Sequence, residues 1–337
     1  MTTLPAIAEG AFAILIFPGL AFAVGYGLFA EFLDRKVTAR LQNRVGPGPT
    51  QPIADYLKLF ANESIVPEDA TGSVFRIAPL VAFAAVLTAI LYVPTYASTA
   101  AAAFEGDLVV VLALLAVPSV ALVFGGWHSG NAFSRIGTHR TLTQLFGYEV
   151  PFFLACLAPA IAAGSWSISG VTAYVGSHPL YIVALVPGLV VALTGLQAKL
   201  ERVPFDIPKA KTELAGGPTV EYSGRKLAFL ELTKDVEFVV GAALIAALFL
   251  GGPAPAGAIA TLVGGSTTTA AAATIAAGLA VFLVKTLAVV ATLSVAAAVV
   301  ARLRIEQMVR LNLTWLLGLA ICQIAIAIAL ATFEVIP

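Results

Sequence analysis

The run LVVVLALLAVPSVALVFG, from Leu108 to Gly125, is 18 residues long and contains no charged side chain. A helix needs about 20 mostly apolar residues to cross a bilayer, so this run predicts a transmembrane segment. Of the 337 residues in the chain, 59% are hydrophobic and 11% are charged, whereas about a quarter of the residues in soluble domains are charged. With a mean hydropathy of +0.95, the chain is predicted to be an integral membrane protein.

Seven further stretches have a similar composition. They run from Ala6 to Ala30, Ile77 to Ala97, Leu145 to Ala163, Leu180 to Gln197, Val236 to Leu250, Ala270 to Val300 and Leu311 to Thr332. Neither a repeat of fixed period nor a low-complexity linker divides them. The expected fold is an all-α integral membrane protein with about eight transmembrane helices, in which residues 1–337 form one polytopic domain.

The positions of the basic residues predict the orientation of these helices. Eighteen of the 19 lysines and arginines fall in the connections after the first, third, fifth and seventh stretches, and the other is Lys285 inside the seventh. Connections on the cytoplasmic side are rich in Lys and Arg. We therefore expect a multi-pass protein of the cell (plasma) membrane, with both termini on the outer side and two long cytoplasmic loops, residues 31–76 and 198–235.

Within the first long loop, Gln51 to Glu63 has the pattern of a surface helix. Ile53, Leu57 and Phe60 recur at helical spacing, and Pro52 suits a first turn. A helix with one apolar and one polar face lies in the membrane interface. We therefore expect an interfacial amphipathic helix in this loop.

Composition and motifs exclude several classes of protein. The 19 basic residues balance 19 acidic residues, and a chain without net positive charge is not suited to hold nucleic acid. Cys156 and Cys322 stand alone, and His128, His139 and His178 are too scattered for a metal site. The sequence contains no phosphate-binding loop motif and no dinucleotide-binding glycine motif. It predicts no metal site and no self-contained ATPase or dehydrogenase.

Glu149 and Lys285 are the main candidates among the ionisable residues within predicted spans, where charged groups are costly and mark ion pathways. Glu149 is at the start of the fourth span, close to Pro151. It is either a member of an ion path or a carboxylate solvated at the membrane interface. Lys285 lies near the middle of the seventh span. Its ammonium group must face a cavity, contact a carboxylate or lose its proton.

A charged group also precedes the sixth span. Its members are Glu231, Lys234, Asp235 and Glu237, and the first three are spaced to share a helical face. A solvated helix start explains these residues as well as a proton relay does.

Three segments carry a family resemblance. The first contains DRKV at 34–37, RLQ at 40–42, RVGP at 44–47, QPIAD at 51–55 and KL at 58–59. The second contains GW at 126–127, SGN at 129–131, Arg140, QL at 144–145 and YEVP at 148–151. The third contains RVPFDIP at 202–208, EL at 213–214 and EYSG at 221–224. Together they resemble the membrane subunit that joins the soluble and membrane arms of respiratory complex I, and its counterpart in energy-converting membrane-bound NiFe hydrogenases.

The resemblance implies a function. A subunit of this family is not catalytic alone. It anchors soluble Fe–S and NiFe-type subunits, or related quinone-site subunits, on its cytoplasmic loops, and it couples their redox reaction to antiporter-like membrane subunits that move H⁺ or Na⁺. Fe–S clusters and any NiFe centre belong to the partners, no cofactor is expected in this chain, and quinone-using members form the quinone's entry tunnel. Lipid and these subunits, and not nucleic acid, are the expected partners.

The same resemblance points to particular residues. The proton or ion path would use Glu149, Glu213 and Glu221, and to these we add the charged residues Glu201, Glu231, Lys234, Asp235, Glu237 and Lys285. The junction with the soluble arm, or a quinone-like cavity, would use Arg35, Arg40, Asp55, Arg202, Asp206, Lys209, Lys211 and Tyr222.

The sequence departs from the complex I pattern near these positions. Lys209 and Lys211 stand where complex I members usually have carboxylates after the PFD motif. Lys234 stands at a family glutamate, and Glu201 stands at a position that is usually asparagine. Basic residues therefore interrupt the acidic path.

The two lysines after the PFD motif need carboxylate partners if they lie in a low-dielectric junction. Glu201, Asp206 and Glu213 are the near candidates in sequence. In a helical turn after the motif, Lys209 and Glu213 would stand at i,i+4 and pair on one face.

Other features bear on the branch of the family. The short first loop and the GGP at 216–218 resemble the hydrogenase branch, whereas GW with SGN and QL with YEVP resemble the quinone branch. The hydrogenase branch is favoured. The alternatives are the quinone-site subunit of a complex I-like NADH:quinone oxidoreductase and, from another class, a stand-alone secondary transporter. A transporter should show inverted repeats and paired broken helices, which we do not find in the sequence.

Overall fold

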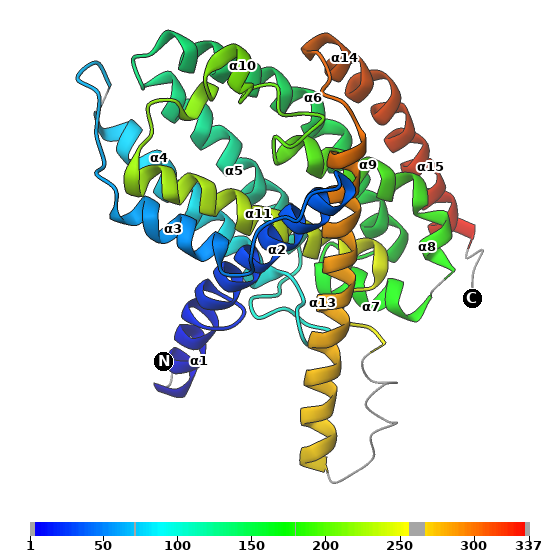
Figure 1. Cartoon of the computed structure of the whole chain (residues 1–337). Coiled ribbons are helices and arrows are strands. Elements are labelled where there is room, and N and C mark those ends of the chain that lie inside the picture. The colour runs from blue at the N-terminus through cyan, green and yellow to red at the C-terminus, as the bar shows by residue number, and fades with distance from the viewer. Residues whose placement is uncertain (1–3, 71, 179, 256–266, 334–337) are drawn as a thin grey trace.

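The computed structural model describes residues 4–70, 72–178, 180–255 and 267–333, and the regular elements in these ranges are helices. The longer ones are α1 (Leu4–Leu15), α2 (Leu20–Leu41), α3 (Gln51–Ala61), α4 (Gly72–Ala89), α5 (Asp107–Trp127), α6 (Ala132–Ala163), α7 (Ile168–Ser177), α9 (Val186–Lys199), α11 (Gly224–Leu250), α13 (Thr267–Val299) and α15 (Leu317–Phe333). The shorter ones are η1 (Ile90–Tyr92), α8 (Tyr181–Ala184), α10 (Lys211–Leu214), η2 (Gly217–Thr219), α14 (Ile305–Arg310) and the π-helix η3 (Leu311–Leu316). The predicted all-α fold is confirmed (Figure 1).

Six helical segments of the described chain are long and apolar enough to cross a membrane. They are Ala8–Leu41, Gly72–Tyr92, Asp107–Trp127, Ala132–Ala163, Ala272–Val299 and Ile305–Thr332. The other two predicted stretches are helical but differ in length or charge. α9 has only 14 residues, and α11 carries Lys234, Asp235 and Glu237 around the start of its apolar stretch. The chain is a multi-pass membrane protein.

Several helix boundaries differ from the predicted ones. The first stretch, predicted as one helix, is divided between α1 and α2, and Pro18, which lacks a backbone N–H, lies at the break. α6 begins at Ala132 instead of Leu145, because the Asn131 side chain accepts hydrogen bonds from two backbone N–H groups of the first turn. α7 lies in a connection where we predicted no helix.

α11 runs through the middle of the bundle, and α2, α4, α7, α9 and α13 pack around it (Figure 1). Every residue from Val236 to Phe249 is buried. A helix that is apolar on all sides is stable when other elements surround it. The charged residues at the start of this buried stretch are therefore drawn into the interior of the protein.

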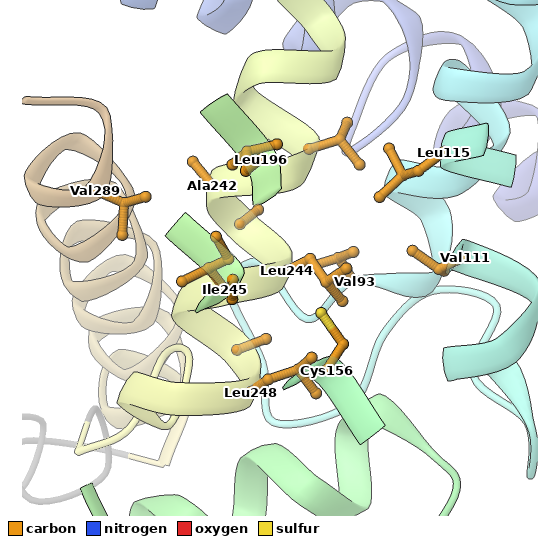
Figure 2. Close-up of a cluster of buried hydrophobic side chains, with 14 of the residues drawn as sticks. Val93, Val111, Leu115, Cys156, Leu196, Ala242, Leu244, Ile245, Leu248 and Val289 are labelled. Carbon is orange, nitrogen blue, oxygen red and sulfur yellow. The ribbon is translucent and has the colours of Figure 1, made fainter. Parts of the chain in front are cut away.

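Figure 2 shows the core around α11. Val111 and Leu115 of α5, Cys156 of α6, Leu196 of α9 and Val289 of α13 gather around Leu244 and its neighbours on α11. Lipid is as apolar as these side chains, so close packing stabilises the contacts between helices. Gly241 illustrates the closeness, because a Cβ atom at this position would lie 2.4 Å from a methyl carbon of Leu196.

The helix predicted in the first long loop is present as α3, and two of its residues attach it to α11. The Tyr56 hydroxyl donates a hydrogen bond to Asp235 at 2.6 Å, and the Phe60 ring packs edge-on against a phenylalanine of α11. Ile53 and Leu57 are 48% and 66% exposed. The expected apolar stripe is therefore split, since Phe60 packs on protein while the other two side chains point outward.

Candidate ion path and arm junction

Glu149 on α6 forms an ion pair with a lysine that was predicted, from the sequence, to lie in a cytoplasmic loop. Lys199 is the last residue of α9, its side chain is fully buried, and its Nζ lies 3.3 Å from Glu149 Oε2. The ammonium group also lies 5.2 and 5.7 Å from the ring centroids of Tyr148 and Phe152, which is favourable for a cation. Because only 17% of the Glu149 side chain is exposed, the structure does not favour a solvated carboxylate at the interface.

A second group of charges surrounds Glu201, whose side chain is 3% exposed. Its Oε2 lies 3.3 Å from Lys209 Nζ and 3.8 Å from Lys234 Nζ. Lys234 on α11 also lies 3.5 Å from Glu237 Oε2. Its Nζ donates to the backbone carbonyl of Lys199 at 3.4 Å. Lys234 therefore joins the second group of charges to the pair on α6 and α9.

The charges of Glu201 and Lys209 support each other. Burial raises the pKa of the Glu201 carboxyl. The ammonium groups of Lys234 and Lys209 lower this pKa by more than burial raises it, so the net shift is downward. Burial lowers the pKa of the Lys209 ammonium, but the carboxylates of Glu201 and Glu231 raise it more, so the net shift is upward. Both groups therefore remain charged at neutral pH.

The buried charge cluster consists of Glu149, Lys199, Glu201, Lys209, Lys234 and Glu237. Its three lysines and three glutamates cancel in formal charge, as buried ions require. Several oxygens in and beside it have no hydrogen-bond donor among the described residues: both of Glu237, one of Glu149, and the side-chain carbonyls of Gln144 and Gln197. Buried polar acceptors of this kind are typical positions for internal water.

Lys285 lies against the C-terminal end of α11. Its Nζ donates hydrogen bonds to the backbone carbonyls of Leu250, Gly252 and Ala254, at 2.5, 2.9 and 2.6 Å. Leu250 ends α11, and Gly252 and Ala254 lie in the turn that follows it. The last carbonyls of a helix have no partner within the helix and carry partial negative charge. The ammonium group caps the end of α11. This role differs from the three alternatives considered from the sequence, in which the group faces a cavity, contacts a carboxylate or loses its proton.

The expected ion pair between Lys209 and Glu213 is wrong. α10 begins at Lys211, so Lys209 precedes the helix and does not share a helical face with Glu213. Glu213 pairs instead with Arg140 of α6, at 2.6 Å. The hydrogen bond and the charge of Arg140 hold the pKa of the Glu213 carboxyl below its usual value. Glu213 is ionised at the surface, with 53% of its side chain exposed.

Lys211 and Arg40 are exposed. Neither makes an ion pair with any residue in the described ranges. A carboxylate partner was expected for Lys211 only in a low-dielectric environment, and this condition is not met, because its charge is accessible to solvent.

Glu221 and Tyr222 are placed by the elements around them. The Asn131 amide, which also caps α6, donates to Glu221 Oε1 at 2.6 Å. The Tyr222 ring stacks on Phe75 with centroids 4.2 Å apart, and its hydroxyl donates to the Phe75 carbonyl at 3.2 Å. Neither residue is hydrogen-bonded or ion-paired to the buried charge cluster in the described structure.

The remaining junction residues pair with charges from other elements. Arg202 pairs with Asp34, Asp206 with Arg302, and Arg35 with both Glu31 and Asp55. These pairs join α2, α3, the loop after α9 and the segment before α14. Surface ion pairs contribute roughly 0–1 kcal/mol each, so their main effect is to fix the relative positions of the inner loops.

Lys234 and Asp235, predicted to share a face with Glu231, contact different elements. Lys234 points into the buried charge cluster, whereas Asp235 accepts the hydrogen bond from Tyr56 on α3. Consecutive helical residues point about 100° apart, which explains the separation. Burial and the Asp235 carboxylate raise the pKa of the Tyr56 hydroxyl, so it remains a donor. Glu231 makes no ion pair with a described residue.

Sequence reasoning missed Lys199, which was counted only as a basic residue of an inner loop. A signal was available, because Lys199 ends an uncharged run that begins at Leu180 and lies two residues before Glu201. A charged residue at the end of an apolar segment can lie inside the protein as well as in a loop, and Lys199 pairs with Glu149 of α6. The direction of each side chain depends on how α9 and α11 pack, which the sequence does not specify.

These observations define a class: a polytopic membrane subunit with paired charges in its interior and salt-bridged loops at one end. A family model described as NADH dehydrogenase matches residues 13–328, and the chain belongs to this family. The resemblance found in the sequence is confirmed.

Relatives support the same assignment. The H subunit of the NADH-quinone oxidoreductase of Bacillus thuringiensis subsp. konkukian (strain 97-27) is 35% identical over 250 residues, 72% of this chain and 74% of the relative. The same protein of Bacillus cereus (strain AH187) matches to the same extent. Among solved structures, a chain of the membrane-bound sulfane sulfur reductase, an archaeal respiratory membrane complex, is 28% identical with a TM-score of 0.81, covering 95% of this chain and 99% of that chain. The protein is a membrane subunit of a complex I-related complex.

Proposed function

We propose that this chain anchors the soluble electron-transfer arm of its complex and couples the redox reaction to proton or Na⁺ translocation. The observation that supports this function is the buried charge cluster. It draws side chains from α6, the end of α9, the following loop and α11. A protein that served only as an anchor would gain little from six charges in its interior, since buried ions carry a large desolvation cost.

Lys234 is the element that can switch. It lies between two carboxylates, 3.8 Å from Glu201 and 3.5 Å from Glu237. A change of charge at the inner loops alters the balance between these contacts, because electrostatic forces act strongly across a low-dielectric interior. A shift of Lys234 toward one carboxylate leaves the other free to take up a proton. The cluster thereby transmits a redox event at the loops to groups deeper in the bundle.

The partners follow from this arrangement. The inner loops, fixed by the Arg202–Asp34, Asp206–Arg302 and Arg35–Asp55 pairs, dock the soluble subunits. Antiporter-like membrane subunits receive the signal from the bundle. The Fe–S and NiFe-type redox groups are carried by the soluble partners, and this chain supplies no redox cofactor. With basic loops inside, both termini lie on the outer side of the cell membrane.

The branch of the family is proposed from the sequence. The short first loop and the GGP at 216–218 favour a membrane-bound NiFe hydrogenase. The second candidate is the quinone-site subunit of a complex I-like oxidoreductase, favoured by the 35% identity to relatives named as part of NADH-quinone oxidoreductase. A stand-alone transporter is not proposed, because the relatives are named as parts of larger enzymes.

Two experiments test the proposal. Purification of the intact complex, followed by identification of its subunits and assays of hydrogen evolution, quinone reduction and sulfane sulfur reduction, decides between the branches. For coupling, Glu149→Gln keeps the side-chain shape but removes the titratable group, so the complex should assemble, retain electron transfer and lose most ion translocation per turnover. Glu68→Gln, an exposed residue outside the cluster, is the control. Full ion translocation by an assembled Glu149→Gln complex would contradict the proposed coupling function.

A further inference from the structure

A groove beside the last span contains two opposite charges without ion-pair partners. It has a volume of about 550 Å³ and lies between α6 and the helical segment formed by α14 and η3. Its walls include Thr143, Glu306, Val309, Arg310, Leu313 and Thr314. None of these residues belongs to the buried charge cluster.

The charged pair has an unusual arrangement. Glu306 and Arg310 are exposed and stand four residues apart, where opposite charges usually attract each other. Within the described chain, neither side chain makes an ion pair with the other or with any third residue. Two opposite charges that are separated along one groove suit a ligand that carries one positive and one negative group.

The rest of the groove is suited to a lipid. Val309 and Leu313 form an apolar wall, and Trp315, the residue after Thr314, is 69% exposed. Arginine and tryptophan near the end of a span are typical of the membrane–water interface. The Thr314 side chain is exposed, and its hydroxyl has no hydrogen-bond partner among the described residues, so it is free to donate. The groove thus combines charged side chains, a hydroxyl group and an apolar wall, which are the kinds of contact that a phospholipid head group and acyl chain make.

We propose that the groove binds one zwitterionic phospholipid with a primary amine, a phosphatidylethanolamine. Its phosphate contacts Arg310 and the Thr314 hydroxyl, its ammonium contacts Glu306, and an acyl chain lies along Val309 and Leu313.

Two physical reasons select this head group. A guanidinium group binds phosphate through charge-assisted hydrogen bonds, and a primary ammonium donates such bonds to a carboxylate. The trimethylammonium group of phosphatidylcholine has no N–H to donate. An anionic phosphatidylglycerol would satisfy Arg310 but would leave Glu306 unpaired beside a like charge.

The test uses the complete complex purified from membranes. After detergent washing, the complex is equilibrated with an equimolar mixture of isotope-labelled phosphatidylethanolamine, phosphatidylcholine and phosphatidylglycerol, and retained lipid is quantified by mass spectrometry. The variants Glu306→Gln and Arg310→Gln each remove one charge from the groove. The double variant Glu68→Gln with Arg225→Gln is the control, because it removes one acid and one base that are exposed and make no ion pair elsewhere in the described chain.

We expect the parent and the control to retain phosphatidylethanolamine about tenfold over phosphatidylcholine, and each groove variant to lose this preference. Equal retention of the three lipids by the parent would overturn the proposal, as would a preference for phosphatidylglycerol or unchanged selectivity in both groove variants. Disulfide or reagent cross-linking of a Thr314→Cys variant to another protein of the intact complex would show that protein covers the groove instead.

Discussion

The ammonium group of Lys199 lies 3.3 Å from a carboxylate oxygen of Glu149, and the lysine side chain is fully buried. The contact joins the end of α9 to the middle of α6. It also brings the backbone carbonyl of Lys199 to Lys234, which donates to it at 3.4 Å. One residue therefore connects the two groups of the buried charge cluster, by its side chain on one side and by its backbone on the other.

Lys199→Met should destabilise the complex strongly. The substitution leaves Glu149 without its ion-pair partner, and removal of one partner from a buried pair costs about 3–5 kcal/mol. The double variant Lys199→Met with Glu149→Gln removes both charges and should regain much of that loss, because the two residues are in contact. Denaturation of the purified complex, compared across the two single variants and the double variant, measures this coupling. Additive losses would mean that the pair contributes nothing in the native state.

The pH dependence of stability should be set by Glu201 in acid and by Lys209 in base. The pKa of Glu201 is lowered from 4.5 on folding, so its stabilisation is present above that value and is lost as the pH falls through the folded pKa. The pKa of Lys209 is raised from 10.5, so its stabilisation is present below that value and is lost as the pH rises through the folded pKa. The difference in stability between the parent and Glu201→Gln should be constant from about pH 5 to about pH 9. Thermal inactivation at intervals of pH measures it, and a change centred near pH 7 would contradict the assignment.

Lys285→Met should weaken the end of α11 without altering coupling. The substitution removes a charged donor from three carbonyls, and hydrogen bonds to charged groups contribute about 1.5–3 kcal/mol. A loss of stability of at least about 2 kcal/mol is expected, while ion translocation per turnover in the assembled fraction stays at the parental value. A complex of normal stability that no longer translocates ions would instead place Lys285 on the ion path.

Much of the fold followed from local composition. The eight apolar stretches all contain helix, because apolar runs of this length have few alternatives in a bilayer. The division at Pro18 was missed, although a proline within an apolar run is a local signal for a helix break. The helix α7 was missed because it lies in a connection between spans. The early start of α6 depended on an asparagine cap, which a hydropathy pattern does not report.

The candidate site was predicted less completely. Glu149, Glu201, Lys234 and Glu237 were named as path residues, and the structure brings them together with Lys209. Lys199 was missed. Glu201, one of the three candidate partners of Lys209, is its partner, whereas the pairing with Glu213 required a helical turn that the chain does not form at Lys209. Ion pairs between distant segments are decided by tertiary packing, whereas sequence spacing predicts only pairs within one element.

Cysteine labelling tests the orientation. Ser98, in the connection after η1, and Thr50 and Thr212, in the two long loops, are exposed. The native Cys322 is exposed and Cys156 is buried, so the background variant carries Cys322→Ser. In sealed cells, an impermeant thiol reagent should label Ser98→Cys but not Thr50→Cys or Thr212→Cys. Labelling of the loop positions before permeabilisation would reverse the topology.

Lys209 and Lys211 provide a matched pair for the junction, because they are two residues apart and differ in environment. Lys209 contacts Glu201 at 3.3 Å inside the buried charge cluster, whereas Lys211 is exposed and has no ion-pair partner among the described residues. Lys209→Glu places a second carboxylate against Glu201 and leaves the cluster with four glutamates and two lysines. Like charges at this separation repel strongly in a low dielectric.

The expected result is a clear difference between the two variants. Lys209→Glu should impair assembly, or lower ion translocation per turnover at least several-fold in the complexes that form. Lys211→Glu adds the same charge in solvent, where the effect is typically within about 0.5 kcal/mol, and should behave as the parent. Translocation is measured in the reconstituted complex, and assembly is measured separately by size-exclusion chromatography. If Lys209→Glu assembles and translocates as well as Lys211→Glu, the contact between Lys209 and Glu201 has no part in coupling.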